Sequence, residues 1–319
     1  MDAAGLHSLG TPPRFEQVPE PIAGDGEVIV QVHAASLKPI DKQVASGSHY
    51  ASPRDLPVVC GTDGVGLLSD GQRVFFGGAR APYGAMAQRA VVRRAFSFPV
   101  PEGVDDATAA ALPNPAVSAW LSLAFRAKLT QGENVLILGA TGVTGKLAVK
   151  IAKLLGAGRV VAAGRNPQVL STLDQVGADA TIRLDAPAQE LADGFVRVAG
   201  SSGFQVVIDY VWGRPAEAFL AATTRKDFVV ITSETRFVQV GESAGSTISL
   251  PAAVMRSKAL TILGTAGIPP HDILVDAVHQ VMTHAARGEL RMETERVQLT
   301  DIENAWQRDS HGRRLVITP

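Results

Sequence analysis

The chain has 319 residues, of which 46% are apolar and 19% are charged, and its net charge at pH 7 is −1. This length predicts about two domains, and the composition is that of a well-packed globular protein rather than a disordered one. The near-zero net charge excludes a general attraction to nucleic acids or to anionic membranes.

Two further features concern the compartment. No apolar run approaches the length of a membrane span, and residues 1–5 lack the basic and apolar regions of a secretion signal. The single cysteine, Cys60, excludes an intrachain disulfide and fits a reducing environment. We therefore expect a cytoplasmic protein that has neither a nucleic-acid nor a membrane partner.

Residues 1–113 are predicted to be mostly β structure. The apolar pattern at 28–33 is typical of a strand, and Asp70-Gly71 before the run 72–76 is typical of a hairpin turn. Glycines and prolines interrupt the whole region, as they do in a small irregular barrel.

Near residue 114 the pattern changes to helix. Asn114 offers a capping side chain, Pro115 suits the first helical position, and residues 116–128 follow a helical pattern. We therefore expect a domain boundary between residues 113 and 114.

The most informative motif follows this helix. An apolar run at 134–138 leads into a turn with Ala140, Gly142 and Gly145 at the fingerprint positions, and then into a helical pattern at 145–155. Glycine lets the backbone approach a pyrophosphate, and the helix presents free N–H groups and the positive end of its dipole. Ala140 replaces the first glycine of the usual fingerprint. The strand before the turn and the helix behind it favour a dinucleotide site over an ordinary strand-to-helix turn.

Strands and helices alternate from here to residue 263. Such alternation predicts a parallel sheet covered by helices on both faces. Further strands are predicted at 159–163, 204–208, 228–231 and 260–263, with helices that end near Gly177 and begin at Pro215.

The C-terminal residues return to the first pattern. An amphipathic helix is predicted over 274–285, and a closing apolar strand over 315–317. A chain that returns to strand after an α/β unit indicates that the C-terminus completes the first domain.

Six stretches, spread in order over nearly the whole chain, match one known family. They are residues 36–41, 57–66, the glycine turn, 164–166, 208–209 and 313–317. Together they resemble the medium-chain dehydrogenase/reductase superfamily, in its zinc-independent quinone oxidoreductase-like branch. The resemblance implies an α/β fold in which a Rossmann domain, a doubly wound parallel sheet, is inserted into a partly open, GroES-like β-barrel catalytic domain. The expected divisions are 1–113 for the catalytic domain, 114–265 for the NADPH-binding domain and 266–319 for the return.

The resemblance also bears on zinc. Zinc-dependent members carry a cysteine at the position of Lys38 and a His-Glu pair at the positions of Thr62 and Asp63. A catalytic zinc takes about three Cys, His or carboxylate ligands, so lysine and threonine do not suit it. The four closely spaced cysteines of a structural-zinc lobe are missing too, and His279 and His284 are expected to be solvated. We therefore expect no metal.

The second strand of a Rossmann unit determines the cofactor, because its end meets the adenosine ribose. A carboxylate there favours NAD, whereas an arginine favours the 2′-phosphate of NADPH. Residues 160–168 contain Arg165 and no acid, which favours NADPH over the alternative of an exposed loop arginine. The expected cofactor-binding residues in these two motifs are Ala140, Thr141, Gly142, Val143, Thr144, Gly164, Arg165 and Asn166.

Hydride transfer needs mainly positioning of the nicotinamide against its acceptor. The resemblance places Ser118 and the segments 240–245 and 264–267 near the nicotinamide half, with Gly241, Ser243 and Thr265 as expected contacts. Related quinone reductases carry Asn at the position of Lys38 and Tyr at that of Gln43, so this chain departs from them at both positions.

A proton must also reach the reduced product. The candidate donors are Lys38, Tyr50, Tyr83 and water, although Lys38 could equally form a salt bridge or contact the cofactor. We expect Asp41 to cap the helix or turn that begins beside it, and Cys60 to be buried apolar filler.

Two functions fit these observations. The first is an NADPH-dependent reductase that acts on a small molecule, either a quinone or an α,β-unsaturated carbonyl. The second is a non-catalytic NADPH-binding protein with a redox-sensing or structural role, which the short series of acids and bases permits. In either case we expect a homodimer, because the apolar edge strand at 260–263 needs a cover and relatives pair their sheets there.

Overall fold

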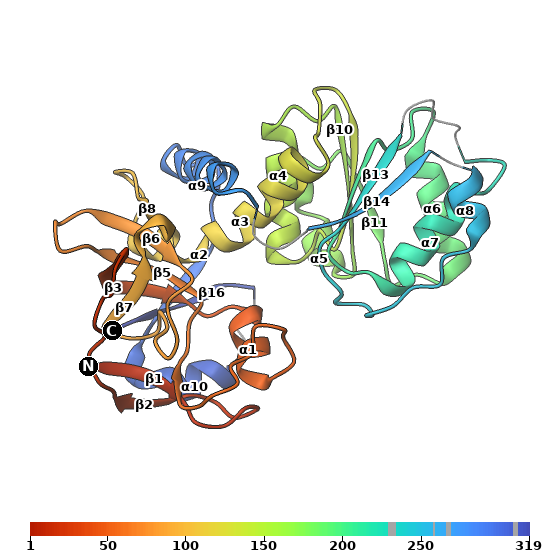
Figure 1. The fold of residues 1–319 in the computed structure, drawn as a ribbon. Helices are drawn as coiled ribbons and strands as arrows, with labels where there is room; N and C mark the ends of the chain where they lie inside the picture. The colour runs from red at the N-terminus through yellow and green to blue at the C-terminus, as the bar shows by residue number, and fades with distance from the viewer. Residues whose placement is uncertain (229–233, 258, 266–268, 309–311) are drawn as a thin grey trace. The chain divides into compact units, whose positions relative to one another are not determined.

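The structure is a computed structural model that describes residues 1–228, 234–257, 259–265, 269–308 and 312–319. The chain forms two units, drawn together in Figure 1. Unit 1 comprises Met1–Asn114 and Val278–Pro319, and unit 2 comprises Pro115–Ala277. The sequence analysis expected the return to begin at residue 266, whereas here it begins inside the helix α9 (His271–Ala286).

Unit 1 is mainly an antiparallel β structure. Its elements are β1 (Asp2–Leu6), β2 (Arg14–Gln17), β3 (Glu27–Ser36), α1 (Pro39–Ser46), β4 (Val58–Val59), β5 (Asp63–Leu67), β6 (Arg73–Gly77), β7 (Arg89–Arg93), the 3₁₀ helix Arg94–Phe96, β8 (Ser97–Pro99), α2 (Asp106–Ala111), β15 (Thr294–Gln298), the 3₁₀ helix Leu299–Asp301, α10 (Ile302–Gln307) and β16 (Arg314–Thr318). The larger sheet has the order β15-β16-β3-β5-β6-β8, with β7 also paired to β3, and a smaller sheet has the order β2-β1-β4.

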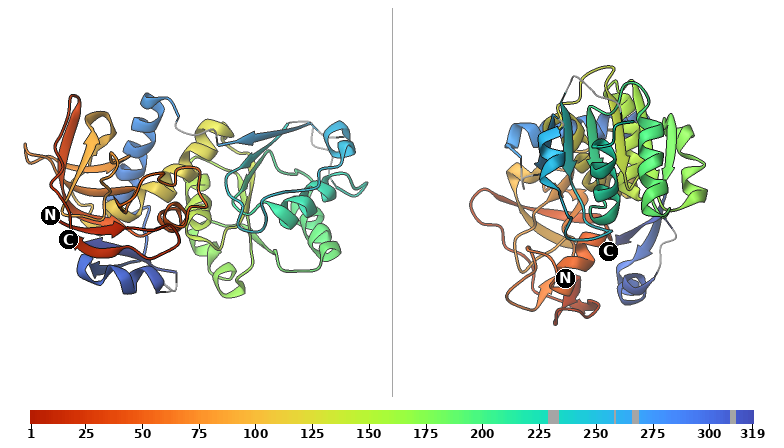
Figure 2. Two further views of the ribbon diagram at one scale, coloured as in Figure 1. Left: turned by 60° about the horizontal axis from the view of Figure 1, so that its bottom comes forward. Right: turned by 90° about the vertical axis from the view of Figure 1, so that its right-hand side faces the viewer.

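Two sequence predictions are confirmed in unit 1. The Asp70-Gly71 turn joins β5 to β6 as an antiparallel hairpin, and Gly71 supplies the positive φ of +81° that the turn requires. The C-terminal strand β16 pairs with β3, with Val316 opposite Ser36. The two chain termini lie close together in unit 1, as the three views of Figures 1 and 2 show.

The core of unit 1 joins segments that are far apart in the sequence. Phe76 and Met86 from the first hundred residues pack with Ile302, Trp306 and Leu315 from the C-terminal segment. Burying such large apolar side chains is the main favourable contribution to folding. The C-terminal segment is therefore part of the hydrophobic core of unit 1.

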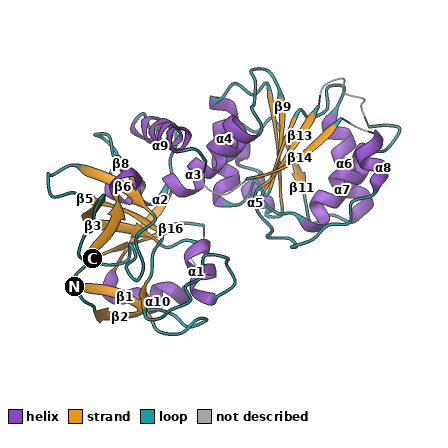
Figure 3. Ribbon diagram, viewed as in Figure 1, coloured by secondary structure: helices purple, strands orange, loops and turns teal. Residues whose placement is uncertain are grey.

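Unit 2 is a six-stranded parallel sheet with helices on both faces (Figure 3). Its elements are α3 (Pro113–Trp120), which begins in unit 1, the π-helix Leu121–Arg126, β9 (Asn134–Leu138), α4 (Val143–Leu154), β10 (Arg159–Gly164), α5 (Pro167–Leu170), the 3₁₀ helix Leu173–Val176, β11 (Ala180–Arg183), α6 (Ala188–Ala199), β12 (Val206–Asp209), α7 (Gly213–Thr223), β13 (Thr235–Gln239), α8 (Ala252–Ser257) and β14 (Leu260–Gly264). The strand order is β11-β10-β9-β12-β13-β14, which confirms the predicted doubly wound sheet.

Several elements of unit 2 differ from the sequence prediction. The strands β11 and β13 and the helix α6 were not predicted, because β11 and β13 are short and only partly apolar. Of the strand predicted at 228–231, Phe228 lies in a bend and residues 229–231 lie outside the described residues. The helix expected before Gly177 is divided into α5 and the short 3₁₀ helix.

The prediction that the Asn114 side chain caps a helix is also wrong. The helix α3 begins one residue earlier, at Pro113, and continues into a π-helical turn. The Asn114 side chain instead forms a hydrogen bond with Asp63 of β5. Its amide therefore serves a contact within unit 1 rather than the first turn of α3.

Among the described residues, no helix combines the length and apolar character that a membrane crossing requires.

Candidate functional site

The glycine turn of unit 2 joins β9 to α4. Its positive φ, +90°, belongs to Gly139, so Ala140 can replace the usual first glycine without a conformational penalty. A Cβ on Gly145 would clash with the Gly139 carbonyl oxygen. Gly145 therefore allows the start of α4 to pack directly on the turn, which is the role that a dinucleotide fingerprint gives its last glycine.

The first turn of α4 is the segment that the sequence predicts to hold a pyrophosphate. Gly142 is the N-cap residue and has no side chain to cap the helix. The amide of Gly142 donates to Gly139 over 3.1 Å, whereas the amides of Val143 and Thr144 belong to the first turn, which has no intrahelical acceptors. These amides and the positive end of the helix dipole suit an anion. The pyrophosphate of a dinucleotide therefore fits this turn.

The end of β10 lies beside this turn. Gly164 is buried, and a Cβ there would collide with the side chain of Thr141. Arg165 follows it and is exposed. The Asn166 side chain caps α5 by accepting a hydrogen bond from the Val169 amide over 3.1 Å. Of these predicted cofactor residues, Arg165 is available to a ligand, whereas Asn166 already has a structural task.

An acid lies near Arg165 in space although none is near it in the sequence. Asp185 follows β11, and its pKa is held below its usual range, first by a hydrogen bond from Arg183 and in smaller part by the charge of Arg165. Residues 160–168 themselves contain no acid. The pairing of β10 with β11 could not be read from that window, so both Asp185 and Arg183 were missed.

The loops after β12 and β13 lie at the same edge of the sheet. The backbone carbonyl of Asp209 accepts hydrogen bonds from the amides of Val240 and Gly241 over 2.8 and 3.1 Å. The Ser243 hydroxyl donates to the Tyr210 carbonyl over 3.3 Å. Two of the four residues expected at the nicotinamide half, Gly241 and Ser243, are therefore brought together here.

The remaining predicted residues of unit 2 are less well defined. Thr265 directly follows β14 and is exposed, and residues 266–267 of the expected segment lie outside the described residues. Ser118 lies in α3, is half-buried, and accepts a hydrogen bond on its carbonyl from the Ser122 hydroxyl over 2.8 Å.

Asp209 is a buried carboxylate at this edge. Its Oδ1 atom accepts hydrogen bonds from the amides of Val211 and Trp212 over 2.8 and 2.9 Å. Its Oδ2 atom is buried and finds no hydrogen-bond partner among the described residues. Burial raises the pKa of Asp209 to about 6, although the two amide hydrogen bonds oppose the shift. Such groups are found more often at functional sites than elsewhere.

In unit 1, Lys38 forms the centre of a buried polar cluster. Its side chain is 1% exposed, and its Nζ atom donates to Asp63 over 2.8 Å, to the Ser36 carbonyl over 3.0 Å and to the Ser36 hydroxyl over 3.2 Å. The Asp41 carboxylate lies 3.3 Å from the same Nζ atom. Every proton of the ammonium thus has an acceptor within the protein.

The charge state of Lys38 follows from these neighbours. Burial by itself would lower the pKa of the ammonium, but the carboxylates of Asp41 and Asp63 outweigh burial and raise that pKa above its usual value. Lys38 is therefore a poor proton donor in this arrangement. These contacts agree with the alternative prediction for Lys38, in which it forms a salt bridge.

Asp41 caps the helix α1, as predicted, from the third position of the helix. Its Oδ2 atom accepts a hydrogen bond from the Lys38 amide over 2.8 Å, and its Oδ1 atom accepts one from the Thr62 amide over 3.0 Å. Arg314 lies nearby and donates from Nη1 to the Leu37 carbonyl over 3.2 Å. The cluster therefore joins α1 to β16 as well as to β5.

The other predicted catalytic residues lie apart from this cluster. Tyr50 is 94% exposed and stacks on His49. The Tyr83 hydroxyl donates to the Glu20 carbonyl over 3.3 Å, and its ring packs on the Met1 and Ala3 side of the barrel. Neither tyrosine has a contact with Lys38 among the described residues. Cys60 is buried, and burial raises the pKa of its thiol to about 12, so it is inert filler as expected.

The two histidines of α9 differ in their surroundings. His279 is exposed as expected, but His284 is only partly exposed and lies 2.6 Å from the Glu289 carboxylate, so the prediction of a solvated ring is wrong for it. Within the described part of the chain, no group of three His, Cys, Asp or Glu side chains is arranged to hold a metal ion. The positions expected to hold zinc in zinc-dependent relatives contain the Lys38 ammonium instead.

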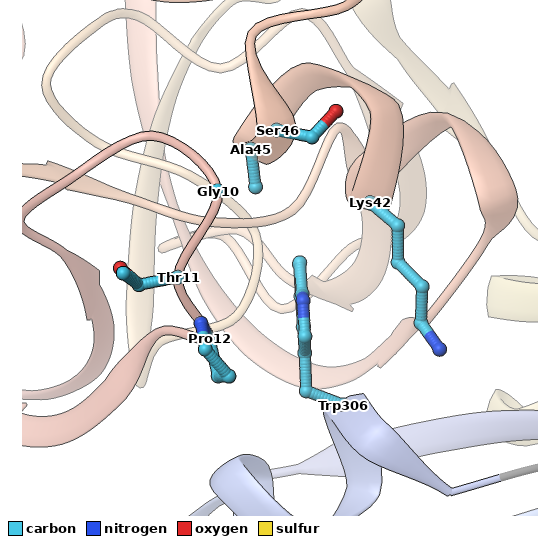
Figure 4. A pocket seen from close by; sticks show the side chains of 7 residues that line it. All are labelled: Gly10, Thr11, Pro12, Lys42, Ala45, Ser46 and Trp306. Atoms are coloured by element: carbon cyan, nitrogen blue, oxygen red, sulfur yellow. The ribbon is translucent and has the colours of Figure 1, made fainter.

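Unit 1 also has a small surface cleft of about 110 Å³, shown in Figure 4. Lys42 and Ala45 of α1, Thr11 of the loop after β1, and Trp306 of α10 line it. None of the predicted site residues is among the residues that line this cleft, so we do not assign it to the site.

Comparisons with known proteins identify dehydrogenases and quinone oxidoreductases as similar to this chain. Residues 143–280 match a family model described as zinc-binding dehydrogenase. Quinone oxidoreductase-like protein 2 of Rattus norvegicus is 28% identical over 273 residues, which cover 82% of this chain and 74% of that protein.

Two solved structures are also similar over the full length of both chains. The quinone oxidoreductase of Thermus thermophilus, whose structure was also determined with NADPH, has 27% identity and a TM-score of 0.80. A mycobacterial quinone oxidoreductase has 21% identity and a TM-score of 0.86, which supports the fold alone.

Proposed function

Because the chain belongs to the quinone oxidoreductase-like branch of the medium-chain dehydrogenase/reductase superfamily, we propose that it is an NADPH-dependent reductase. Its acceptor is a quinone or an α,β-unsaturated carbonyl, and it works without zinc. The observation that carries the proposal is the uncapped first turn of α4 with the exposed Arg165 beside it.

The residues of unit 2 divide the cofactor between them. The amides of Val143 and Thr144 would hold the pyrophosphate, and Arg165 would hold the 2′-phosphate. The loop that carries Gly241 and Ser243 would border the nicotinamide half. Bound NADPH supplies the hydride for an electron-poor carbon of the acceptor, and the contribution of the protein is to orient the two.

Lys38 is the residue that supports a reaction without zinc. Its ammonium lies between the Asp41 and Asp63 carboxylates and already neutralises part of their charge. A divalent cation would have to enter against this fixed positive charge. Purified protein is expected to contain no stoichiometric zinc and to keep its activity in chelators; about one zinc per chain by elemental analysis would contradict this.

The proton source is a separate part of the proposal. The hydrogen bonds of Lys38 and the raised pKa of its ammonium disfavour it as a donor, which leaves water, Tyr50 and Tyr83. If Tyr50 donates the proton, Tyr50→Phe lowers kcat by about 10²-fold while NADPH affinity is unchanged. An unchanged kcat for Tyr50→Phe and Tyr83→Phe assigns the role to water.

Steady-state NADPH oxidation with a panel of quinones and enones tests the whole proposal. We expect turnover with at least one acceptor, with NADH and a reaction without acceptor as controls. The rival function is a non-catalytic NADPH-binding protein. It is favoured because Lys38 and Tyr83, two of the candidate proton donors, already form hydrogen bonds within unit 1. Tight NADPH binding without turnover of any acceptor would establish the rival. Preference for NADH would overturn the cofactor assignment.

The proposal includes a homodimer. The strand β14 (Leu260–Gly264) is the last strand in the order of the sheet, and its first four residues are half-buried in one chain. A second copy paired there would cover the edge. Light scattering at micromolar concentration should give twice the mass of one chain, and a monomer mass would contradict the pairing.

A further inference from the structure

The neighbourhood of Arg165 contains a second arginine that the proposed function has not used. In the parallel pairing of β10 with β11, Gly164 lies opposite Arg183. Paired strands lie about 4.8 Å apart, so Arg183 lies one strand spacing from Gly164, and Arg165 follows Gly164 at the same end of the sheet. Both Arg165 and Arg183 are exposed there.

Arg183 is held by a carboxylate in the absence of ligand. Its Nε atom donates to Asp185 Oδ1 over 3.0 Å, and its Nη2 atom donates to Asp185 Oδ2 over 2.6 Å. The side chains are 60% and 40% exposed. An exposed pair of this kind adds little to stability, so exchanging its acceptor costs little.

Two further arginines act on or beside the Asp185 carboxylate. Arg214, at the start of α7, donates a hydrogen bond to the carbonyl of Ala186, the residue next to Asp185. The charge of Arg165 also acts on Asp185. The loop after β11 therefore presents one negative group to two guanidinium groups at the edge where the adenosine ribose of a dinucleotide belongs.

We infer that Arg183 is a second ligand for the 2′-phosphate of NADPH, and that Asp185 occupies its guanidinium until the phosphate displaces the carboxylate. A guanidinium binds carboxylate and phosphate through the same two-bond geometry. The 2′-phosphate brings about −1.5 to −2 charges and three acceptor oxygens, whereas Asp185 brings one charge. NADH offers only a hydroxyl at this position. Asp185 thus limits how strongly the site prefers NADPH.

This inference rests on the proposed use of NADPH, and direct binding tests the two separately. The probes are adenosine 2′,5′-bisphosphate and adenosine 5′-monophosphate, titrated calorimetrically into the full chain. The two nucleotides differ only in the 2′-phosphate. Wild-type protein is expected to bind the bisphosphate more tightly, and equal binding of the two would contradict the proposed NADPH specificity itself.

The variants then test Arg183 and Asp185. Arg183→Gln is expected to weaken bisphosphate binding about tenfold, through the loss of one charge-assisted contact, and to leave the monophosphate unchanged. Asp185→Asn is expected to strengthen bisphosphate binding about threefold or more, because a competing charge is removed. The double variant should lose most of that gain.

The chain offers a matched control. Arg225 forms the same two-bond contact with a carboxylate two residues later, from Nε to Asp227 Oδ1 over 2.9 Å and from Nη2 to Asp227 Oδ2 over 2.7 Å. It follows the end of α7, which returns the chain to the opposite edge of the parallel sheet. Arg225→Gln should change the binding of neither nucleotide.

Three results would overturn the inference and leave NADPH use intact. The first is an unchanged affinity of Arg183→Gln for the bisphosphate, while the wild type still prefers it. The second is an equal loss of both nucleotides, which would give Arg183 a role in holding the loop. The third is weaker bisphosphate binding by Asp185→Asn, which would make Asp185 a group that orients Arg183 rather than one that competes.

Discussion

Lys38 in unit 1 and Arg183 in unit 2 each donate to a carboxylate, over 2.8 Å and 2.6 Å respectively. The lysine is 1% exposed and has acceptors for every proton, whereas the arginine is 60% exposed and has a single carboxylate partner. At similar distances, the two contacts differ in what they cost to break.

The reason is solvation. A buried ion that loses its partner keeps the full cost of its own desolvation, whereas an exposed ion regains water. The Lys38 cluster is therefore suited to a fixed structural role, and the Arg165 and Arg183 side chains are suited to an incoming ligand. Water can reach the Arg183 pair, but it cannot reach the Lys38 pair.

The largest expected effect is on the stability of unit 1. Lys38→Met leaves the Asp41 and Asp63 carboxylates buried without their cation, and it should lower the free energy of unfolding by about 3–5 kcal/mol. Cys60 is the only cysteine of the chain and is buried in unit 1. The urea dependence of its labelling by a thiol reagent therefore reports the opening of unit 1 specifically.

Lys42→Met is the matched control for this experiment. Lys42 lies in α1, the helix that begins directly after Lys38, and it lines the surface cleft. Its replacement should therefore change stability by less than about 0.5 kcal/mol. If both variants expose Cys60 at the same urea concentration as the wild type, the Lys38 cluster contributes nothing to the fold and the comparison fails.

Asp209 extends the comparison of buried and exposed charges to unit 2. It is a buried carboxyl group that has no cationic partner among the described residues. Its pKa is raised from 3.8 to about 6, so between these values the unfolded chain has released a proton that the folded chain still holds. Stability therefore falls as the pH rises through this window. Asp209→Asn should be about 2–3 kcal/mol more stable than the wild type at pH 8, since each pKa unit is worth 1.36 kcal/mol.

The advantage of Asp209→Asn should largely disappear near pH 4, because the folded carboxyl is then protonated and the unfolded one, with its pKa of 3.8, is only about half ionised. Urea denaturation at the two pH values measures this, with the exposed Asp227→Asn as control. An equal difference between wild type and Asp209→Asn at both pH values would show that the unpaired Oδ2 atom carries no charge penalty.

Replacing Arg165 is expected to have the smallest effect of the three substitutions, and the effect is on the free energy of cofactor binding. Arg165→Ala should weaken NADPH binding about 10- to 100-fold, because a charge-assisted hydrogen bond is worth about 1.5–3 kcal/mol. NADH binding should hardly change, and neither should the urea midpoint, since the side chain is exposed. Equal losses for both cofactors would mean that Arg165 supports the loop and not the phosphate.

The sequence was sufficient where a signal is local. The glycine turn, the strand before it and the helix behind it lie within a span of some twenty residues, and β9, α4 and β10 occur within two residues of their predicted bounds. The hairpin between β5 and β6 has its own turn residues and was predicted for the same reason.

The sequence was insufficient where strands are short, and where charged side chains from different elements contact each other. The strands β11 and β13 are held by their neighbours in the sheet rather than by an apolar pattern of their own, and both were missed. The role of Lys38 depends on Asp63, which is 25 positions away in the sequence. From the sequence alone, that lysine remained a candidate proton donor.

The sequence by itself determined the family resemblance, the α/β class and the glycine turn between β9 and α4, because each depends on residues within one turn or one strand–helix unit. Only the tertiary structure decided which charged side chains are available to a ligand. That availability depends on burial and on partners brought together by strand pairing, such as Asp63 beside Lys38 and Asp185 beside Arg183. Burial and pairing are properties of the folded chain, since the same side chains would be hydrated and separate in the unfolded one.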